Sequence, residues 1–355
     1  MNASAAIAEA FARLPAYLGG HAAVSVTALL IGLAISLPLA VASMRQPALR
    51  SVLLGVASVV QTVPSLALLA LFYPLLLGIA MLTERAFGAG FSALGFLPSV
   101  LALTLYSMLP VLRNTIAGLE GIAPAIKEAA QGVGMTRRQA LLMVELPLAL
   151  PVIMAGIRTA AIWVIGAATL STPIGQTSLG NYIFTGLQTQ NWVFVLFGCA
   201  AAAVFALAVD QLLALMESGL TRRRRGFVVG GAIGLLLIMA MSLAPGLSQQ
   251  RASYVIGTKP FAEQYVLAAL IAQRLGDGGQ SATTREGLGS AVIFDALRTG
   301  DIDVYVDYSG TIWANQMKRS DVKPRAEVLA EMKDWLQRES GIALVGGQDH
   351  ATFVD

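Results

Sequence analysis

The sequence of 355 residues is too apolar for an ordinary water-soluble protein. Hydrophobic residues make up 56% of it and charged residues only 13%, whereas soluble domains carry about 25% charged residues. So many apolar side chains cannot all fit a water-soluble core, and the composition therefore predicts a membrane protein. The net charge of +3 combines an excess of Lys and Arg in residues 1–250 with an excess of Asp and Glu in residues 251–355. Because the basic excess lies in the apolar part, it indicates membrane orientation and not nucleic-acid binding.

Apolar stretches long enough to cross a bilayer recur through the first 250 residues. A transmembrane helix needs about 20 apolar residues, and these stretches predict about six spans in a mainly α-helical, polytopic bundle. The predicted spans are residues 22–43, 52–77, 98–117, 148–168, 192–215 and 227–244. The segment 171–191 is rich in Gly, Thr, Gln and Asn, and is predicted to be a loop or a re-entrant segment.

The connections between these spans differ in charge. Ten of their Lys and Arg residues fall in segments 44–50, 113–145 and 217–225, and two fall in the alternate segments. Positive loops stay in the cytoplasm, so the N-terminus and residues 251–355 are predicted to be extracytoplasmic. Arg158 lies inside the fourth predicted span. It is either a functional intramembrane charge or a side chain that reaches the cytoplasmic edge because the span starts later.

After residue 248 the long apolar stretches give way to shorter segments of mixed polarity. Strand-like and helix-like segments alternate with short loops, which predicts a parallel α/β sheet. The expected strands are 254–257, 283–285 and one beginning at 301, and the expected helices are 262–275 and 291–298. The predicted organisation is a transmembrane domain at 1–220, an extra transmembrane helix and linker at 221–250, and a partial α/β domain at 251–355.

One long basic connection contains the sequence EAAQGVGMTRRQALLMVELP, residues 128–147. It resembles the cytoplasmic coupling motif of ABC importer permeases, which reads Glu-Ala-Ala, three residues, Gly, nine residues, Ile, any residue, Leu-Pro. The matching positions are Glu128, Ala129, Ala130, Gly134, Val144, Leu146 and Pro147, with Val144 in place of Ile. The resemblance implies the ABC permease fold and a short helix–turn–helix that docks into a dimeric cytoplasmic ATPase.

The chemistry of the motif agrees with that role. Small Ala129 and Ala130 allow close approach to a partner, and Gly134 permits a sharp turn. Glu128 suits a helix start and can also pair with an arginine of the partner. Pro147 is predicted to mark a break before the next span. The alternative is an ordinary charged loop between two helices.

The sequence has no phosphate-binding loop of the form Gly-x-x-x-x-Gly-Lys-Ser/Thr. The chain is therefore predicted to be a transport subunit, not an enzyme, with no catalytic residues and no cofactor of its own, while the ATPase partner uses ATP. The resemblance also implies a second permease copy, most simply a homodimer, in the bacterial inner membrane. His21 and His350 have no partners at metal-binding spacing, so no metal site is expected.

Three segments of the α/β part resemble the first lobe of binding proteins for quaternary ammonium osmoprotectants. They are IGTKPFAEQYVLA (256–268), GLGS (287–290) and DIDVYVDYSGT (301–311), and the membrane part resembles the permeases of those systems. The resemblance, over about residues 20–340, implies uptake of glycine betaine, choline, carnitine or proline betaine. Residues 346–355 do not follow the pattern. The second lobe is therefore expected to be missing in nature or to follow a truncated end.

The resemblance and the chemistry of such ligands indicate the binding residues. A trimethylammonium group has no N–H to donate and is held by aromatic faces through cation–π attraction, for which Tyr308 is the first candidate. Lys259 and Thr311 are assigned to the ligand carboxylate, together with backbone N–H groups near Phe261 and Ala262 at a helix start.

Other residues near these segments have weaker or different assignments. Gln264 and Ser290 are further candidates for ligand contact. Tyr305 has the opposite strand parity to Tyr308 and is interpreted as structural, and Trp313 is either a cage member or, preferably, a packing anchor. Two other function classes stay open, namely an ABC importer permease for another small solute such as an amino acid, and a membrane-anchored solute sensor.

Overall fold

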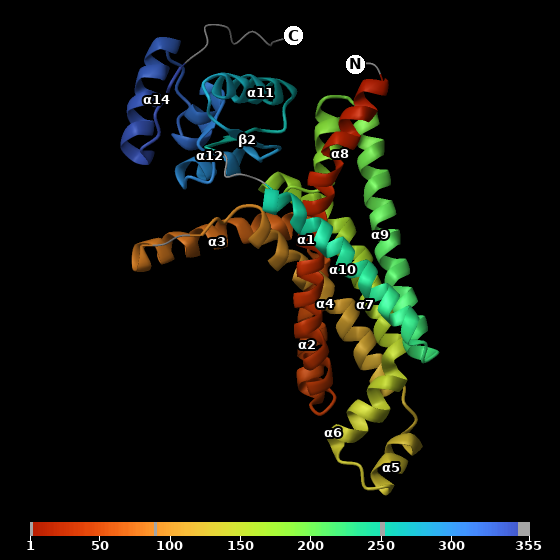
Figure 1. Ribbon diagram of the computed structural model, residues 1–355. Coiled ribbons are helices and arrows are strands. Elements are labelled where there is room, and N and C mark those ends of the chain that lie inside the picture. Colours follow the sequence, from red (N-terminus) through yellow and green to blue (C-terminus); the bar gives the residue numbers. More distant parts are fainter. Residues whose placement is uncertain (1–2, 89–90, 249–252, 347–355) are drawn as a thin grey trace. The chain divides into compact units, whose positions relative to one another are not determined.

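The computed structural model describes residues 3–88, 91–248 and 253–346 (Figure 1). The chain divides into two compact units, residues 1–250 and residues 251–355. The stretch 347–355, which includes His350 and nearly all of the segment that departs from the binding-protein pattern, lies outside the described residues.

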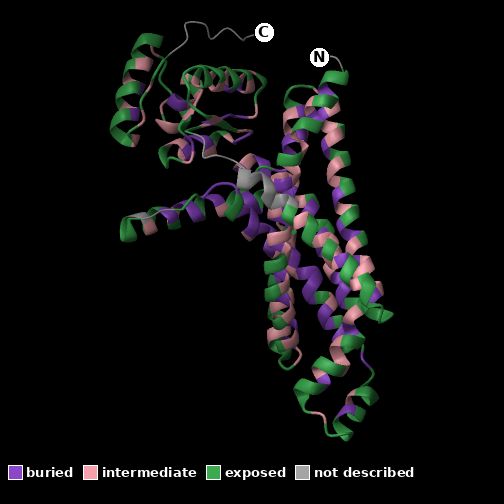
Figure 2. Ribbon diagram, viewed as in Figure 1, coloured by how far each residue is buried: buried purple, intermediate pink, exposed green. Residues whose placement is uncertain are grey.

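The described part of the first unit is helical. Four of its helices form the centre, because α4 packs against both α1 and α7, and α7 packs against α9. Figure 2 shows buried residues where these helices meet and exposed residues on their outer faces. The elements are α1 (Ala3–Ser43), α2 (Pro47–Thr62), α3 (Ser65–Phe87), α4 (Phe96–Glu120), α5 (Pro124–Gly132), α6 (Arg137–Ala140), the π-helical turn η1 (Leu141–Glu145), α7 (Leu146–Ala168), the 3-10 turn η2 (Thr169–Ile174), α8 (Gly180–Gln188), α9 (Trp192–Thr221) and α10 (Arg225–Ser248).

Five helical segments within the described residues are long and apolar enough to cross a membrane. They are Ala3–Ser43, Ser65–Phe87, Phe96–Glu120, Arg137–Ile174 and Trp192–Thr221. Their outer faces carry large exposed apolar side chains, including Leu71, Trp163 and Leu196, as expected for contact with lipid. The chain is therefore a multi-pass membrane protein, and the predicted mainly helical architecture is confirmed.

The predicted span 52–77 is wrong as a single helix. The chain breaks between α2 and α3, where Val63 has an extended backbone with ψ 126°. Val63 precedes Pro64, and the proline ring disfavours the helical conformation in the residue before it. The run of apolar side chains concealed this break, because Pro64 is a single residue in an otherwise uninterrupted hydrophobic sequence.

The segment 171–191, predicted as a loop or a re-entrant segment, contains the end of η2 and the whole of α8. Its polar side chains bond within the bundle: the side-chain oxygen of Asn181 accepts from Ser178 N at 2.8 Å. The Tyr182 hydroxyl donates to the carbonyl of Ala10 in α1 at 2.5 Å. Buried polar groups need such internal partners, and the Tyr182 bond joins α8 to α1.

The second unit is a small parallel α/β structure, which confirms the predicted class. Its three strands are ordered β2-β1-β3, with β1 paired in parallel to both neighbours. The helix α14, which the sequence analysis did not predict, covers a core made by Phe294, Ile312, Met332 and Leu336. The elements are β1 (Tyr254–Gly257), α11 (Ala262–Asp277), β2 (Ala282–Arg285), α12 (Ser290–Arg298), β3 (Val304–Tyr305), α13 (Ser309–Thr311), the π-helical turn η3 (Ile312–Gln316) and α14 (Arg325–Ser340).

Candidate functional site: a coupling segment and a ligand surface

The helices α5 and α6 form a helix–turn–helix at the end of the bundle opposite α8 (Figure 1). Gly134 between them has φ +81°, a left-handed conformation that glycine adopts without a steric penalty. Thr136 then caps α6: its side chain accepts from Gln139 N, and the Gln139 side chain accepts from Thr136 N at 2.8 Å. This reciprocal capping box fixes where α6 begins, so both ends of the turn are defined.

The surface of this segment is apolar as well as charged. Glu128 and Ala129 are exposed on α5, while Ala130 is buried. Large apolar side chains are exposed beside them, with exposed fractions of 74% for Val133 and 65% for Met143. An apolar patch on a solvent-facing loop marks an interaction surface. We call residues 124–147 the coupling segment.

The predicted break at Pro147 is wrong. The elements α6, η1 and α7 follow one another without interruption, and Pro147 sits in the first turn of α7. Leu146 N donates to the carbonyl of Leu141, five residues earlier instead of four. The wider π-helical turn accommodates the proline inside a continuous helix. The coupling segment is therefore joined directly to a membrane-crossing helix.

Arg158 lies in the interior of α7, and its side chain is 31% exposed. Its guanidinium forms two hydrogen bonds with the carboxylate of Asp210 in α9, at 2.8 and 2.9 Å, and a third with Glu217 at 3.1 Å. An intramembrane charge is costly unless it is paired. The two carboxylates provide that pairing and hold α7 against α9. The sequence analysis identified Arg158 but neither of its partners.

In the second unit, Tyr308 follows β3 and presents its ring at the surface. Its side chain is 43% exposed, and the ring centroid lies 6.5 Å from that of Phe261, which is 37% exposed. The Tyr308 hydroxyl donates to the Glu263 carboxylate. Partial burial and this hydrogen bond raise the pKa of Tyr308. Two exposed aromatic rings next to a carboxylate suit a cation.

Lys259 is fully buried and forms an ion pair with Asp307. The Asp307 carboxylate also accepts from the Tyr305 hydroxyl at 2.8 Å and from Tyr308 N at 2.7 Å. Burial and the charge of Asp307 raise the pKa of Tyr305. The ammonium group predicted to face a ligand carboxylate thus already has a carboxylate partner. Asp307 is the central residue of this network, and the sequence analysis missed it although it lies inside the motif DIDVYVDYSGT.

The remaining candidates take different positions. Gln264 is buried in the first turn of α11, next to Glu263. Thr311 is half-buried in α13, and its N–H donates to the carbonyl of Tyr308 at 3.0 Å. Ser290 is exposed in the first turn of α12. Lys259 is thus linked to Tyr308 through Asp307, whereas Thr311 is joined to Tyr308 by the local turn of α13.

Trp313 has the packing role that the sequence favoured. It is buried, and its indole N–H donates to the carbonyl of Asp321 at 3.0 Å. The guanidinium of Arg319 lies 4.3 Å from the ring centroid and binds the Asp321 carboxylate at 2.9 and 3.1 Å. Lys323 binds Glu331 of α14 at 2.5 Å. These contacts connect the loop before α14 to both Trp313 and α14.

This charged network predicts an acid-sensitive α14. The hydrogen bond from Arg319 lowers the pKa of Asp321, and that from Lys323 lowers the pKa of Glu331. Carboxyl groups with lowered pKa values stabilise the fold above their unfolded pKa, about 3.9 for Asp and 4.3 for Glu, and this contribution is lost as the pH falls through the folded value. We expect Glu331→Gln to reduce amide-exchange protection of α14 at pH 7, and the difference from wild type to disappear as the pH falls below about 4.

The comparison of wild type and variant at each pH cancels the intrinsic pH dependence of amide exchange. Glu339→Gln on the same helix is the matched control, and should leave protection unchanged. An effect of Glu331→Gln that is equal at pH 7 and at pH 3 would contradict the assignment.

Known families match both units. Residues 32–225, more than half of the chain, match the family described as "Binding-protein-dependent transport system inner membrane component". Residues 252–346 match the "Substrate binding domain of ABC-type glycine betaine transport system". These matches define a transport subunit of the ABC class. The chain belongs to the binding-protein-dependent inner membrane components and carries, fused to it, a part of the glycine betaine type of substrate-binding domain.

Individual relatives agree with this assignment. The choline transport system permease protein OpuBB of Bacillus subtilis is 39% identical over 57% of this chain and 85% of that protein. The glycine betaine/carnitine/choline transport system permease protein OpuCB of Bacillus subtilis is 38% identical over 57% of this chain and 86% of that protein. The ergothioneine transport permease/ergothioneine binding protein EgtU of Helicobacter pylori is 30% identical over 76% of this chain, which spans 48% of that protein.

Proposed function

We propose that this permease imports quaternary ammonium osmoprotectants, namely glycine betaine, choline, carnitine or proline betaine, and that residues 251–355 contribute half of the binding site. The observation that carries the proposal is the exposed pair of rings, Phe261 and Tyr308, beside the Glu263 carboxylate. A trimethylammonium group attracts aromatic faces by about 0.5–2 kcal/mol each. The sequence relationship to permeases for choline, carnitine and glycine betaine supports the same ligand class.

Within this proposal, Asp307 and Lys259 position Tyr308. Asp307 accepts the Tyr308 backbone N–H at 2.7 Å and is itself held by Lys259 and Tyr305. Because the ion pair is buried, it fixes the backbone that carries the ring. A ligand carboxylate can reach the Lys259 ammonium only by sharing it with Asp307, and the Thr311 hydroxyl is the more accessible donor for that group.

The energy source of the proposed importer is a separate ATPase dimer that docks on the coupling segment and uses ATP. The exposed apolar side chains of Val133 and Met143 support this docking, and a second permease copy completes the transport pathway. The proposed location is the bacterial inner membrane, with the N-terminus and residues 251–355 outside the cytoplasm. The uneven distribution of Lys and Arg between the connections supports this orientation.

Ligand titration after substitution of Tyr308 tests the proposal. Tyr308→Ala removes a ring face and a hydrophobic surface, which should weaken glycine betaine or choline binding by about 1–3 kcal/mol. Tyr308→Phe keeps the ring and loses only the hydroxyl contact with Glu263, so it should bind much more like wild type. Calorimetry is carried out on the importer assembled with a complete two-lobed binding domain.

Two results would contradict the proposal. One is unchanged binding in Tyr308→Ala, and the other is tight binding of a neutral amino acid with no binding of any quaternary ammonium compound. Leu270→Ala, on an exposed position of α11, is the matched control for loss of a surface side chain and should bind as wild type does.

Ergothioneine is a second candidate ligand. The Helicobacter pylori protein EgtU, whose name gives both a permease and an ergothioneine-binding protein, aligns with 76% of this chain. The alignment is longer than the first unit, residues 1–250, so it includes part of the second. Ergothioneine carries a trimethylammonium group and a carboxylate, so it presents the same chemistry to Phe261 and Tyr308. Including it in the titration separates the two candidates by the ratio of their dissociation constants.

A further inference from the structure

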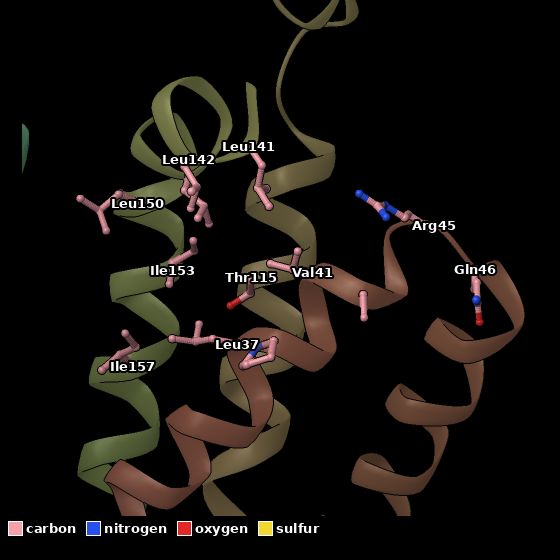
Figure 3. A pocket seen from close by; sticks show the side chains of 13 residues that line it. Leu37, Val41, Arg45, Gln46, Thr115, Leu141, Leu142, Leu150, Ile153 and Ile157 are labelled. Carbon is pink, nitrogen blue, oxygen red and sulfur yellow. The ribbon is translucent and has the colours of Figure 1, made fainter. Parts of the chain in front are cut away.

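A cavity of about 800 Å³ lies in the first unit next to the coupling segment. It is bounded by the C-terminal end of α1, by α4, and by the stretch that leads from η1 into α7 (Figure 3). The walls are mainly aliphatic: Leu37 and Val41 come from α1, and Leu150, Ile153 and Ile157 come from α7. This cavity takes no part in the ligand surface of the second unit, and no role has been assigned to it above.

The cavity is long as well as apolar. Its lining extends along one continuous helix from Leu141 to Ile157, a separation of about 24 Å at a rise of 1.5 Å per residue. The three helices around it, α1, α4 and α7, are all among the segments able to cross a membrane. A long aliphatic cavity between such helices has the shape and polarity of an acyl-chain site.

The polar groups of the cavity are few and unevenly placed. Arg45 is the only charged residue among the described residues that line it. It is exposed at the end of α1, and its side chain forms no ion pair within the described residues. The lining that the structure describes includes no carboxylate. Deeper inside, the hydroxyl of Thr115 is buried without a hydrogen-bond partner in the described part of the chain. The cavity thus combines a cationic mouth, one unsatisfied hydroxyl and aliphatic walls (Figure 3).

We propose that this cavity binds an anionic phospholipid of the inner leaflet, with an acyl chain against α7 and the phosphate at Arg45. Basic residues at the cytoplasmic boundary of a membrane protein attract anionic headgroups, and the unpaired guanidinium supplies that attraction here. Since Leu141 and Leu142 belong to η1, the bound lipid lies directly against the coupling segment. The inference rests on the cavity and on the proposed orientation of the chain in the membrane, and it holds whichever solute the importer carries.

Photo-crosslinking tests the site. The full chain is reconstituted in nanodiscs that contain a diazirine-labelled acyl chain on either phosphatidylglycerol or phosphatidylcholine, and labelled peptides are identified by mass spectrometry. We expect phosphatidylglycerol to label the peptide that contains Leu142–Ile157. Arg45→Gln should reduce this labelling at least fivefold. Arg222→Gln, a cation in the connection between α9 and α10, should leave it unchanged.

A second variant tests the chain pocket separately from the headgroup. Ile153→Trp fills the cavity and should reduce labelling by both lipids, whereas Trp163→Ala on an exposed face of α7 should not. For the wild-type chain, a loss of labelling on competition by unlabelled phosphatidylglycerol, but not by phosphatidylcholine, shows the headgroup preference without any substitution.

Three outcomes would overturn the inference. They are equal labelling by the two lipids, undiminished labelling in Arg45→Gln, and labels that map away from the cavity. Crosslinks from a photoreactive residue at position 153 to a second copy of the chain would show that the cavity is a subunit interface, which also overturns the lipid assignment.

Discussion

Replacing Arg158 with leucine should destabilise the membrane bundle by about 3–5 kcal/mol, the range for leaving a buried charge without its partner. The guanidinium forms three hydrogen bonds, two to Asp210 and one to Glu217, and Asp210 is buried. The variant leaves two carboxylates between α7 and α9 without compensation. Equilibrium unfolding of the full chain in mixed micelles with increasing denaturing detergent measures the loss.

A double-mutant cycle separates pairing from burial. Asp210→Leu alone should destabilise the bundle, but Arg158→Leu together with Asp210→Leu should be less harmful than the sum of the two single changes, because the double variant removes the guanidinium together with its main partner and leaves only Glu217 unpaired. Arg113→Leu on α4 is the control, since its guanidinium makes, within the described part of the chain, only an exposed hydrogen bond to Ser58. Additive effects of the two single changes would show that the Arg158–Asp210 pair contributes nothing to stability.

Gly134→Val should uncouple ATP hydrolysis from uptake. A side chain in the left-handed region costs about 1–2 kcal/mol for ordinary residues, and the φ of +81° is a genuine outlier for a β-branched one. A Cβ at Gly134 would meet no atom within 4 Å, so the change acts through the backbone and not through a clash. The turn then relaxes and moves α6 relative to α5. We expect solute uptake by the importer, reconstituted with its ATPase, to fall about tenfold while basal ATP hydrolysis continues.

Gly132→Ala is the matched control for this turn. It also has open space around a new Cβ, but its φ is not positive because it belongs to α5. Uptake by this variant should be normal. If Gly134→Val transports at the wild-type rate, the left-handed turn is not required for coupling.

For the coupling segment, the spacing of residues in the sequence predicted the turn but not the course of the helix that follows it. The positions of Glu128, Gly134 and Pro147 pointed to a helix–turn–helix, and the positive φ of Gly134 is the conformation that such a turn needs. The effect of Pro147 was misjudged, because the rule that proline ends a helix assumes α-helical hydrogen bonding in the preceding turn. The π-helical turn before it depends on packing of the bundle and has no signature in local propensity.

The ligand surface was predicted less completely. Tyr308 was identified through ligand chemistry and resemblance, and its exposed ring beside Phe261 agrees with that choice. The burial of Lys259 was not foreseen, since a lysine in a short polar loop is ordinarily solvated. Only the three-dimensional arrangement, which brings Asp307 from after β3 to the loop after β1, shows that its charge has a partner. A single sequence gives little information on ion pairs between residues that lie far apart in the chain.

The π-helical turn η1 also determines how α6 is rotated about the helix axis that it shares with α7. An α-helix advances about 100° per residue, and a π-helical turn holds one residue more than an α-helical one. The face that α6 presents is therefore rotated by about 100° from where an uninterrupted α-helix would place it. Deleting one residue from Leu141–Glu145 would restore the α-helical count and turn Arg137 and Arg138 to another side of the α7 axis. Even with every side chain of α5 and α6 retained, a single residue of helix length thus decides which of their faces points outward.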